Sequence, residues 1–327
     1  MTEPVLVDMF ATGFQRTRVL RLGDGTYVWR RAAGPDRPTS LAAPSAQARR
    51  HLAALPRPDF LTLSLPTVSD DGLSYAAPGY LTAAKMLWSD PSPADRARLA
   101  GFLGSVGRLL RVLHTHPAPC GSATAGPVGP ARLAAWMDSG QGPRAATRMH
   151  DMLRKGVGGK RWDAVRDWCS DLSRPAADAV LLHGAMSTGC LILPAEAAPF
   201  PAGEEEDDGG GTPPASGAAL LIGEDLALGP SGFDLGWMLG ELLELRMTAA
   251  HRSVPRPILS ELPTALLAGY GATSDPVVVG RAATLRMLTH AHDFAAYVGW
   301  HPELELYART AARYIDTDGA AALDGGV

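Results

Sequence analysis

The sequence predicts an α+β protein of two lobes, a small β-rich lobe of residues 1–78 and a larger, mostly helical lobe of residues 79–321. The early chain alternates short apolar runs with turn signals, whereas the later chain has mainly the 3.6-residue apolar spacing of helices. One apolar hairpin, residues 179–225, interrupts the helices. Strands followed by helices are typical of α+β folds. Residues 322–327 are expected to form a flexible tail.

Short strands and one helix account for the N-terminal lobe. The expected elements are strands at residues 18–22, 26–31, 61–68 and 73–80 and a helix at residues 45–55. The first two strands flank a Gly-Asp-Gly turn, in which glycine accepts the positive φ of a tight hairpin. Pro78 and Gly79 stand where the chain would pass between the lobes.

The spacing of apolar residues defines the helical lobe. From residue 94 onward one stripe of a long helix contains Leu99, Phe102, Leu103, Val106, Leu110 and Leu113. Further helices are expected at residues 132–154, at 162–172 and from 233 almost to the C-terminus. An acidic insert, residues 194–217, divides the hairpin. Its proline, glycine and like charges bury too little apolar surface to order it, so we expect a solvated loop. A docking role for the insert is the alternative.

Composition excludes several classes of protein. With 327 residues, a net charge of −4 and no basic tail, the chain gives no indication of a nucleic-acid partner. No secretory signal is evident, and no window approaches ~18 uninterrupted apolar residues, so no membrane span is expected. Three scattered cysteines suit a reduced, cytoplasmic compartment. The sequence has no asparagine, so no mechanism can use an asparagine as a metal ligand.

Five motifs carry a family resemblance. In order they are TYVWRRA (residues 26–32), GRLLRVLHTHP (107–117), LLHG (181–184), ALLIGEDLALGP (219–230) and SGFDLGWMLGELLEL (231–245). Together they resemble the aminoglycoside phosphotransferase and choline kinase-like superfamily over nearly the whole chain. The resemblance implies a protein-kinase-like, bilobed fold. It also implies transfer of the γ-phosphoryl group of ATP with Mg²⁺, mostly by positioning and charge neutralisation.

A narrower resemblance rests on residues 223–246 alone. The run from Gly-Glu-Asp to Leu-Glu-Leu-Arg is similar to a divergent branch of kinase-like proteins from gene clusters for class V lanthipeptides and related thioamide peptides. In that branch the kinase-like protein is thought to phosphorylate Ser or Thr of a precursor peptide, and a separate lyase then eliminates phosphate. The resemblance therefore implies a precursor peptide and a lyase as partners.

In the superfamily a lysine binds the phosphates, and here Arg30 or Arg31 stands in its place. Alternation along a strand allows only one of the two to point into the cleft. Arginine binds phosphate as a fork, although two solvated arginines are an equal alternative. The helix acid that orients the cation is replaced by Ala48, and the adjacent Gln47 is the remaining candidate. Gln47 can donate and accept hydrogen bonds but cannot balance a charge.

The turn that carries the chemistry departs most from the family. The position of the general base is Ala185, and the position of the first metal ligand is Cys190. A lost base costs typically ~10²–10⁴ in rate, and a thiol is a poor ligand for Mg²⁺. His183 is the remaining candidate base, although a histidine after an apolar strand also often bonds to backbone.

The second metal position is Gly223, followed at once by Glu224 and Asp225. A local bulge at the glycine would turn one or both carboxylates toward a metal, and we take both as candidate catalytic and metal-binding residues. A solvated turn is the alternative. Asp234 opens the next helix, and the resemblance implies that it braces the catalytic turn.

Three functions remain open. The first is an atypical ATP-dependent kinase for Ser or Thr of a precursor peptide. The second is a catalytically inactive pseudokinase that binds the lyase or a leader peptide. The third is a small-molecule kinase of the aminoglycoside type, which is least favoured because the acidic drug pockets of that group coexist with an intact catalytic aspartate.

Overall fold

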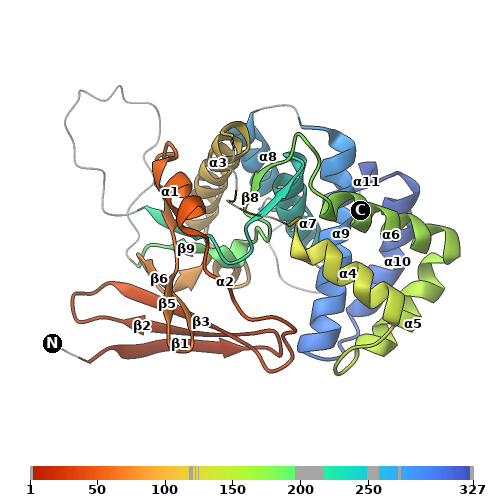
Figure 1. Ribbon diagram of the computed structural model, residues 1–327, viewed down its shortest axis with the longest axis horizontal. Coiled ribbons are helices and arrows are strands. Elements are labelled where there is room, and N and C mark those ends of the chain that lie inside the picture. Colours follow the sequence, from red (N-terminus) through yellow and green to blue (C-terminus); the bar gives the residue numbers. More distant parts are fainter. Residues whose placement is uncertain are drawn as a thin grey trace.

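The computed structural model describes residues 3–117, 121, 123, 125–195, 217–248, 258–271 and 274–324. It has the predicted α+β architecture, with a β-rich N-terminal lobe and a larger helical lobe (Figure 1). None of the described helices is long and apolar enough to cross a membrane. The acidic insert falls almost entirely outside the described residues.

The N-terminal lobe is built on a five-stranded antiparallel sheet. Its order is β1 (Val5–Ala11), β2 (Gln15–Arg21), β3 (Tyr27–Ala33), β6 (Gly72–Ala77) and β5 (Thr67–Ser69). Helix α1 (Ala46–Ala54) begins at Ser45, whose side chain accepts a hydrogen bond from Ala48 N at 3.1 Å. Leu52 of α1 is buried in a small cluster with Leu113 and Leu181 of the other lobe, so α1 packs across the boundary.

A second sheet joins the two lobes. Its order is β4 (Leu61–Ser64), β10 (Ala218–Leu221), β9 (Leu191–Leu193) and β7 (Leu81–Thr82). The expected single strand 61–68 is therefore two strands in different sheets, because Pro66 lacks the N–H that a continuous ladder requires. β4 pairs in parallel with β10. The chain before Pro78 thus contributes a strand to the sheet of the second lobe.

Most of the remaining described residues are in helices. They are α2 (Ala83–Leu87), α3 (Pro93–Thr115), α4 (Val128–Ser139), α5 (Ala146–Val157), α6 (Gly159–Ser173), α7 (Gly232–Thr248), α8 (Ile258–Tyr270), α9 (Pro276–Tyr297), α10 (Leu304–Asp316) and α11 (Ala320–Leu323). The six predicted stripe residues of α3 are all buried. The helix expected at 132–154 is divided, because Gly140 ends α4 in the left-handed conformation. Residues 322 and 323, expected in a flexible tail, belong instead to α11, and Ala322 is buried; residues 325–327 lie outside the described residues.

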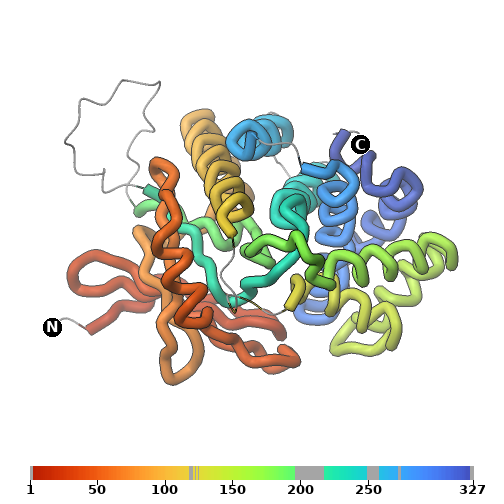
Figure 2. Tube along the Cα trace, turned by 45° about the horizontal axis from the view of Figure 1, so that its top comes forward, coloured from red at the N-terminus to blue at the C-terminus, as the bar shows by residue number. Residues whose placement is uncertain are grey.

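The close packing of α7 on α9 positions the centre of the helical lobe (Figure 2). A Cβ at Gly236 would lie 2.3 Å from the carbonyl oxygen of Val279, and one at Gly240 would lie 2.4 Å from that of Ala283. Both contacts require glycine, because any side chain would separate the two helices. Helix α7 begins directly after the small sheet of β8 (Val180–Leu182) and β11 (Ala227–Gly229).

Candidate active site between the lobes

A buried carboxylate holds the turn that follows β8. Asp234 is fully buried at the start of α7 and accepts hydrogen bonds from the backbone N–H groups of His183 at 2.7 Å and Gly184 at 2.9 Å. His114 of α3 lies 3.2 Å away on the same carboxylate. Burial acts to raise the pKa of Asp234, but the hydrogen bond and charge of His114, with the other donors, lower it. Asp234 therefore ties α3, α7 and the turn together.

This turn packs directly against the Gly-Glu-Asp turn. Gly184 has a φ of +84°, and a Cβ there would lie 1.9 Å from the carbonyl oxygen of Asp225. Gly223 has a φ of +126°, and a Cβ there would lie 3.0 Å from Cγ of Pro44. Only glycine fits this backbone and this space. The two turns are thus fixed side by side, with Ala185 and Asp225 in one cleft.

Arg31 reaches from β3 to the Gly-Glu-Asp turn. Its guanidinium forms an ion pair with Glu224, and both side chains are about nine-tenths buried. The guanidinium also lies 5.6 Å from the ring centre of Tyr75 and 4.0 Å from Sγ of Cys190. Burial acts to lower the pKa of Arg31, but the carboxylate of Glu224 and the neighbouring groups raise it. Arg31 is therefore a fixed positive charge in the cleft.

Asp225 lies beside the ion pair of Arg31 and Glu224, and its own cation partner is farther away. The nearest cation is Arg37, whose Nη2 is 3.8 Å from a carboxylate oxygen of Asp225. Burial raises the pKa of Asp225, and the charge of Glu224 adds to this. A carboxylate in this position gains free energy from any further cation that enters the cleft. Asp225 is thus better placed than Glu224 to accept a metal.

The cleft has a volume of about 410 Å³. Its lining includes Arg31, Ala185, Cys190, Glu224 and Asp225. Two polar atoms are buried there without a hydrogen-bond partner among the described residues, namely Nε of Arg31 and Oε2 of Glu224. Buried polar groups without partners are costly and usually mark a missing partner. A donor and an acceptor therefore remain available for a ligand.

Arg30 and Gln47 are not brought into this cleft. Arg30 follows the buried Trp29 and precedes the buried Arg31, so strand alternation turns it to the other face of the sheet. Gln47 lies against Gly121, since a Cβ on that glycine would be 3.4 Å from Oε1 of Gln47. Neither side chain lines the cleft. Of the two arginines, Arg31 is the one that can bind phosphate.

His183 has backbone partners at both ring nitrogens. Its Nε2 lies 3.0 Å from the carbonyl oxygen of Leu221, and its Nδ1 faces the N–H of Ala185 at 3.4 Å. The side chain is buried and does not line the cleft. With Nε2 donating and Nδ1 accepting, no nitrogen is left to take a proton from a substrate. This geometry favours the structural interpretation of His183 over the catalytic one.

Cys190 also fails as a metal ligand. Burial raises the pKa of its thiol, and only the deprotonated thiolate binds metals well. Among the described residues no group of three or more His, Cys, Asp or Glu side chains is arranged to hold a metal ion. A metal here would therefore depend on one or two carboxylates together with oxygen atoms of a substrate, as Mg²⁺ often does.

Sequence reasoning missed a second ion pair at the cleft. Arg132 of α4 binds Asp293 of α9 through two hydrogen bonds of 3.1 and 2.5 Å. Burial acts to raise the pKa of Asp293, but Arg132 and His292 lower it strongly. The signal was present, because an aspartate inside the apolar run of an interior helix needs a cation. Its partner could not be read from the sequence, since α4 and α9 are far apart along the chain.

Trp29 fills the space beside the segment that joins the lobes. The side chain is fully buried on the same face of β3 as Arg31, two residues before it. Its indole N–H donates to the carbonyl oxygen of Gly79 at 2.9 Å. The carbonyl oxygen of Pro78 accepts from the N–H of Ala195 at 3.1 Å. Both carbonyls of this crossing point are therefore occupied by the chain itself.

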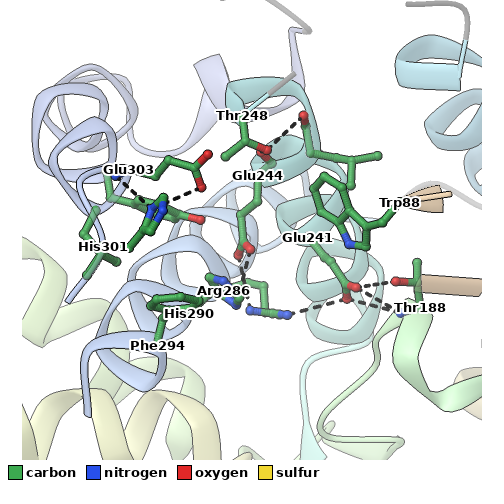
Figure 3. A pocket seen from close by; sticks show the side chains of 13 residues that line it. Trp88, Thr188, Glu241, Glu244, Thr248, Arg286, His290, Phe294, His301 and Glu303 are labelled. Carbon is green, nitrogen blue, oxygen red and sulfur yellow. Dashed lines mark hydrogen bonds and ion pairs between the residues drawn. The ribbon is translucent and has the colours of Figure 1, made fainter. Parts of the chain in front are cut away.

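A smaller side cavity of about 120 Å³ opens between α7, α9 and α10 (Figure 3). Three carboxylates line it, and two of them share one guanidinium. Glu241 and Glu244 lie 3.5 and 3.2 Å from Arg286, and Glu303 lies 3.6 Å from His301. Burial raises the pKa of Glu244 well above its ordinary value in spite of Arg286. The described lining of this cavity thus has three carboxylates but only one fixed cation, Arg286.

Comparison with known structures identifies the fold. A choline/ethanolamine kinase family protein from Mesorhizobium loti matches with a TM-score of 0.50 and 14% identity, over 99% of this chain and 93% of that one. A macrolide 2′-phosphotransferase from Brachybacterium faecium matches with a TM-score of 0.42 and 17% identity, over 98% and 92%. A type VIII aminoglycoside-3′-phosphotransferase gives 0.42 and 18%, over 88% and 92%. The chain has the fold of choline kinase-like phosphotransferases. No family model and no curated protein matches the sequence.

Proposed function

We propose that the protein is an atypical ATP-dependent phosphotransferase that phosphorylates Ser or Thr of a ribosomal precursor peptide. A separate lyase would then eliminate the phosphate. The observation that supports this most is the convergence of Arg31, Glu224 and Asp225 in one cleft between the lobes. The sequence likeness of residues 223–246 to kinase-like proteins of lanthipeptide clusters supports the peptide as acceptor. The buried free thiols of Cys169 and Cys190 suit work in the cytoplasm.

The residues of the cleft fit a nucleotide phosphate and Mg²⁺. Nε of Arg31 is a buried donor without a partner, and Oε2 of Glu224 is a buried acceptor without one. We assign the phosphates to Arg31 and the metal to Asp225 with Glu224. When bound, Mg²⁺ would neutralise the charge that develops on the transferred phosphoryl group. Arg31 would orient the phosphates, and Glu224 would hold Arg31 in position.

The missing base limits the rate of such an enzyme without preventing transfer. Ala185 cannot accept a proton, and a lost general base costs typically ~10²–10⁴ in rate. Positioning and charge neutralisation supply most of the acceleration in phosphoryl transfer. Without a base at position 185, the hydroxyl proton would pass to an oxygen of the transferred phosphoryl group.

A transfer assay tests this proposal. The purified protein is incubated with γ-labelled ATP, Mg²⁺ and a synthetic Ser/Thr-rich peptide, and label on the peptide is measured. We expect slow, Mg²⁺-dependent labelling that Asp225→Asn abolishes, because the metal would lose its main ligand. The matched control is Asp163→Asn on the exposed side of α6. Labelling that persists in Asp225→Asn contradicts the assignment.

The second candidate is a pseudokinase that binds the lyase or a leader peptide without chemistry. The hydrogen bond from the indole N–H of Trp29 to the carbonyl oxygen of Gly79 favours this pseudokinase. By resemblance β3 is the strand of the nucleotide pocket, so an indole that already donates to a carbonyl oxygen between the lobes would compete with a purine for that acceptor. A complete lack of ATP binding would support this candidate. The third candidate, an aminoglycoside-type kinase, is least favoured because Ala185 stands where that group has its catalytic aspartate.

A further inference from the structure

The two edges of the N-terminal sheet differ sharply. At one edge β5 has three residues, whereas at the other β1 has seven. Natural proteins protect sheet edges with short strands, lysine or proline. β1, with the sequence VLVDMFA, contains neither lysine nor proline, and its protection is limited to Asp8 and to a shift of register against β2 between Leu6 and Asp8. Among the described strands it pairs with β2 alone, so its outer row of N–H and C=O groups has no strand beside it.

This free edge is also apolar on its surface. Val5, Leu6, Val7, Met9 and Phe10 are 63, 52, 41, 65 and 41% exposed. Five large apolar side chains are exposed on this one short strand, divided between the two faces of the sheet because successive side chains alternate. Exposed apolar side chains gathered in this way mark an interaction site. Over seven residues the edge extends ~24 Å. An unpaired strand with apolar side chains is complementary to another extended chain, because backbone hydrogen bonds and side-chain contacts then form together.

The position of β1 indicates which chain would bind. β1 runs along the free edge of the sheet from the N-terminus toward the helical lobe (Figure 1). Its last residues enter the candidate active site, because Phe10 and Thr12 both line the cleft. Phe10 also contacts Trp29, with ring centres 6.1 Å apart. A chain paired with β1 would therefore have one end at the entrance of the cleft.

A second copy of this protein fits the edge less well. If two β1 strands paired antiparallel over their full length, Asp8 would lie opposite Asp8 of the other copy. Like charges directly opposite one another destabilise a strand pair. The pairing of Asp8 with Lys85 of α2 reduces this repulsion, but it brings a second charged side chain from each copy to the same point. A foreign extended chain meets no such repulsion.

We infer that β1 is the docking strand for the peptide substrate, which adds to the sheet as a sixth strand and presents its hydroxyl to the cleft. The identity of the peptide as the substrate rests on the proposed function. The mode of binding, pairing with β1, does not. The docked segment is extended and rich in β-branched apolar residues. A segment that precedes the modified residue runs parallel to β1, and one that follows it runs antiparallel.

Binding is measured without nucleotide or metal, so that docking is tested separately from transfer. The probe is a fluorescein-labelled, amidated nine-residue peptide of alternating valine and threonine with lysine at both ends, followed by anisotropy. We expect saturable binding to the full chain and a loss of at least about 10-fold in affinity in Met9→Lys. Met9 is well exposed, so its replacement should leave the melting temperature nearly unchanged. The matched control is Val68→Lys, 76% exposed on β5, which should bind like the wild type.

Three results overturn the inference. One is no binding of the peptide at ~1 mM, which is weaker than the usual range of specific recognition. Another is equal loss of binding in Met9→Lys and Val68→Lys, which indicates a general charge effect. The third is a wild-type dimer in sedimentation equilibrium that Met9→Lys dissociates, because the edge then serves self-association. Peptide binding without any phosphate transfer supports docking and counts against the proposed kinase activity alone.

Discussion

The turn after β8 has two sides, and they differ in how completely their polar groups are satisfied. On the lower side, which faces α3 and α7, the carboxylate of Asp234 is surrounded by hydrogen-bond donors from His183, Gly184 and His114. On the cleft side, Arg31 and Glu224 are paired, yet each has a buried polar atom without a partner. The lower side therefore stabilises the fold, whereas the cleft side has hydrogen-bonding groups without partners that a ligand can satisfy.

The largest expected effect concerns the lower side. Asp234→Ala removes a buried carboxylate and leaves two backbone N–H groups and His114 without their acceptor. We expect a loss of about 4 kcal/mol in the free energy of unfolding, measured by urea denaturation. Asp163→Ala, at an exposed position on α6, is the control and should change stability by less than about 0.5 kcal/mol. Equal stability of both variants would contradict the bracing role of Asp234.

The carboxylate of Asp234 also determines the direction in which the stability of the fold changes with pH. The pKa of Asp234 is lowered in the folded protein, so the unfolded chain binds more protons in the acidic range. The stability that Asp234 contributes is present above its ordinary, unfolded pKa and is lost as the pH falls through its lowered folded pKa. Between pH 7 and pH 3 the difference in stability between wild type and Asp234→Ala should therefore become smaller. A constant difference would contradict this linkage.

The next effect concerns the cleft side. Ala185→Asp places a carboxylate at the position where the family has its base. If the remaining machinery is intact, phosphate transfer should become faster by about 10²-fold, the lower end of the range for a general base. Ala185→Asn has nearly the same size without basicity and should give no gain in the same labelling assay. No gain in Ala185→Asp, with the fold retained by circular dichroism, favours the pseudokinase.

A smaller effect concerns the crossing point between the lobes. Trp29→Phe keeps an aromatic ring but removes the hydrogen bond to Gly79. The loss of the buried hydrogen bond, together with the smaller ring, should reduce the free energy of unfolding by about 2 kcal/mol. If the indole competes with a purine, the same variant should gain a larger melting-temperature increase from Mg-ATP than the wild type. Trp168→Phe, a buried tryptophan on α6, is the control for general loosening of the core.

The smallest effect is expected at Asp225. Its pKa is raised by burial and by Glu224, so the folded protein binds a proton more tightly than the unfolded chain does. Stability associated with this group therefore falls as the pH rises through its raised pKa. Asp225→Asn should be at least as stable as the wild type at pH 8, as measured by thermal unfolding. A clear loss of stability would show that the carboxylate is structural.

The sequence predicted the secondary structure and the order of the two lobes better than it predicted the residues of the candidate site. The apolar stripe of α3 and the two-lobe order follow from local periodicity, which tertiary contacts reinforce. The role of Pro66 in dividing a strand between two sheets was missed, because both halves have strand-like composition. Which of Arg30 and Arg31 faces the cleft could not be predicted from the sequence, because it depends on which face of β3 is turned toward the cleft. The contacts of Trp29 with Gly79 and of Arg132 with Asp293 join distant segments, and no local pattern reveals them.

Calorimetric titration of Mg-ATP into the wild type and into Asp225→Asn tests the central assignment most directly. The account predicts saturable binding to the wild type and an affinity at least about 10-fold lower in the variant, equivalent to about 1.4 kcal/mol. Asp163→Asn should bind like the wild type. Absence of Mg-ATP binding to the wild type, or equal affinity in wild type and Asp225→Asn, would contradict the account.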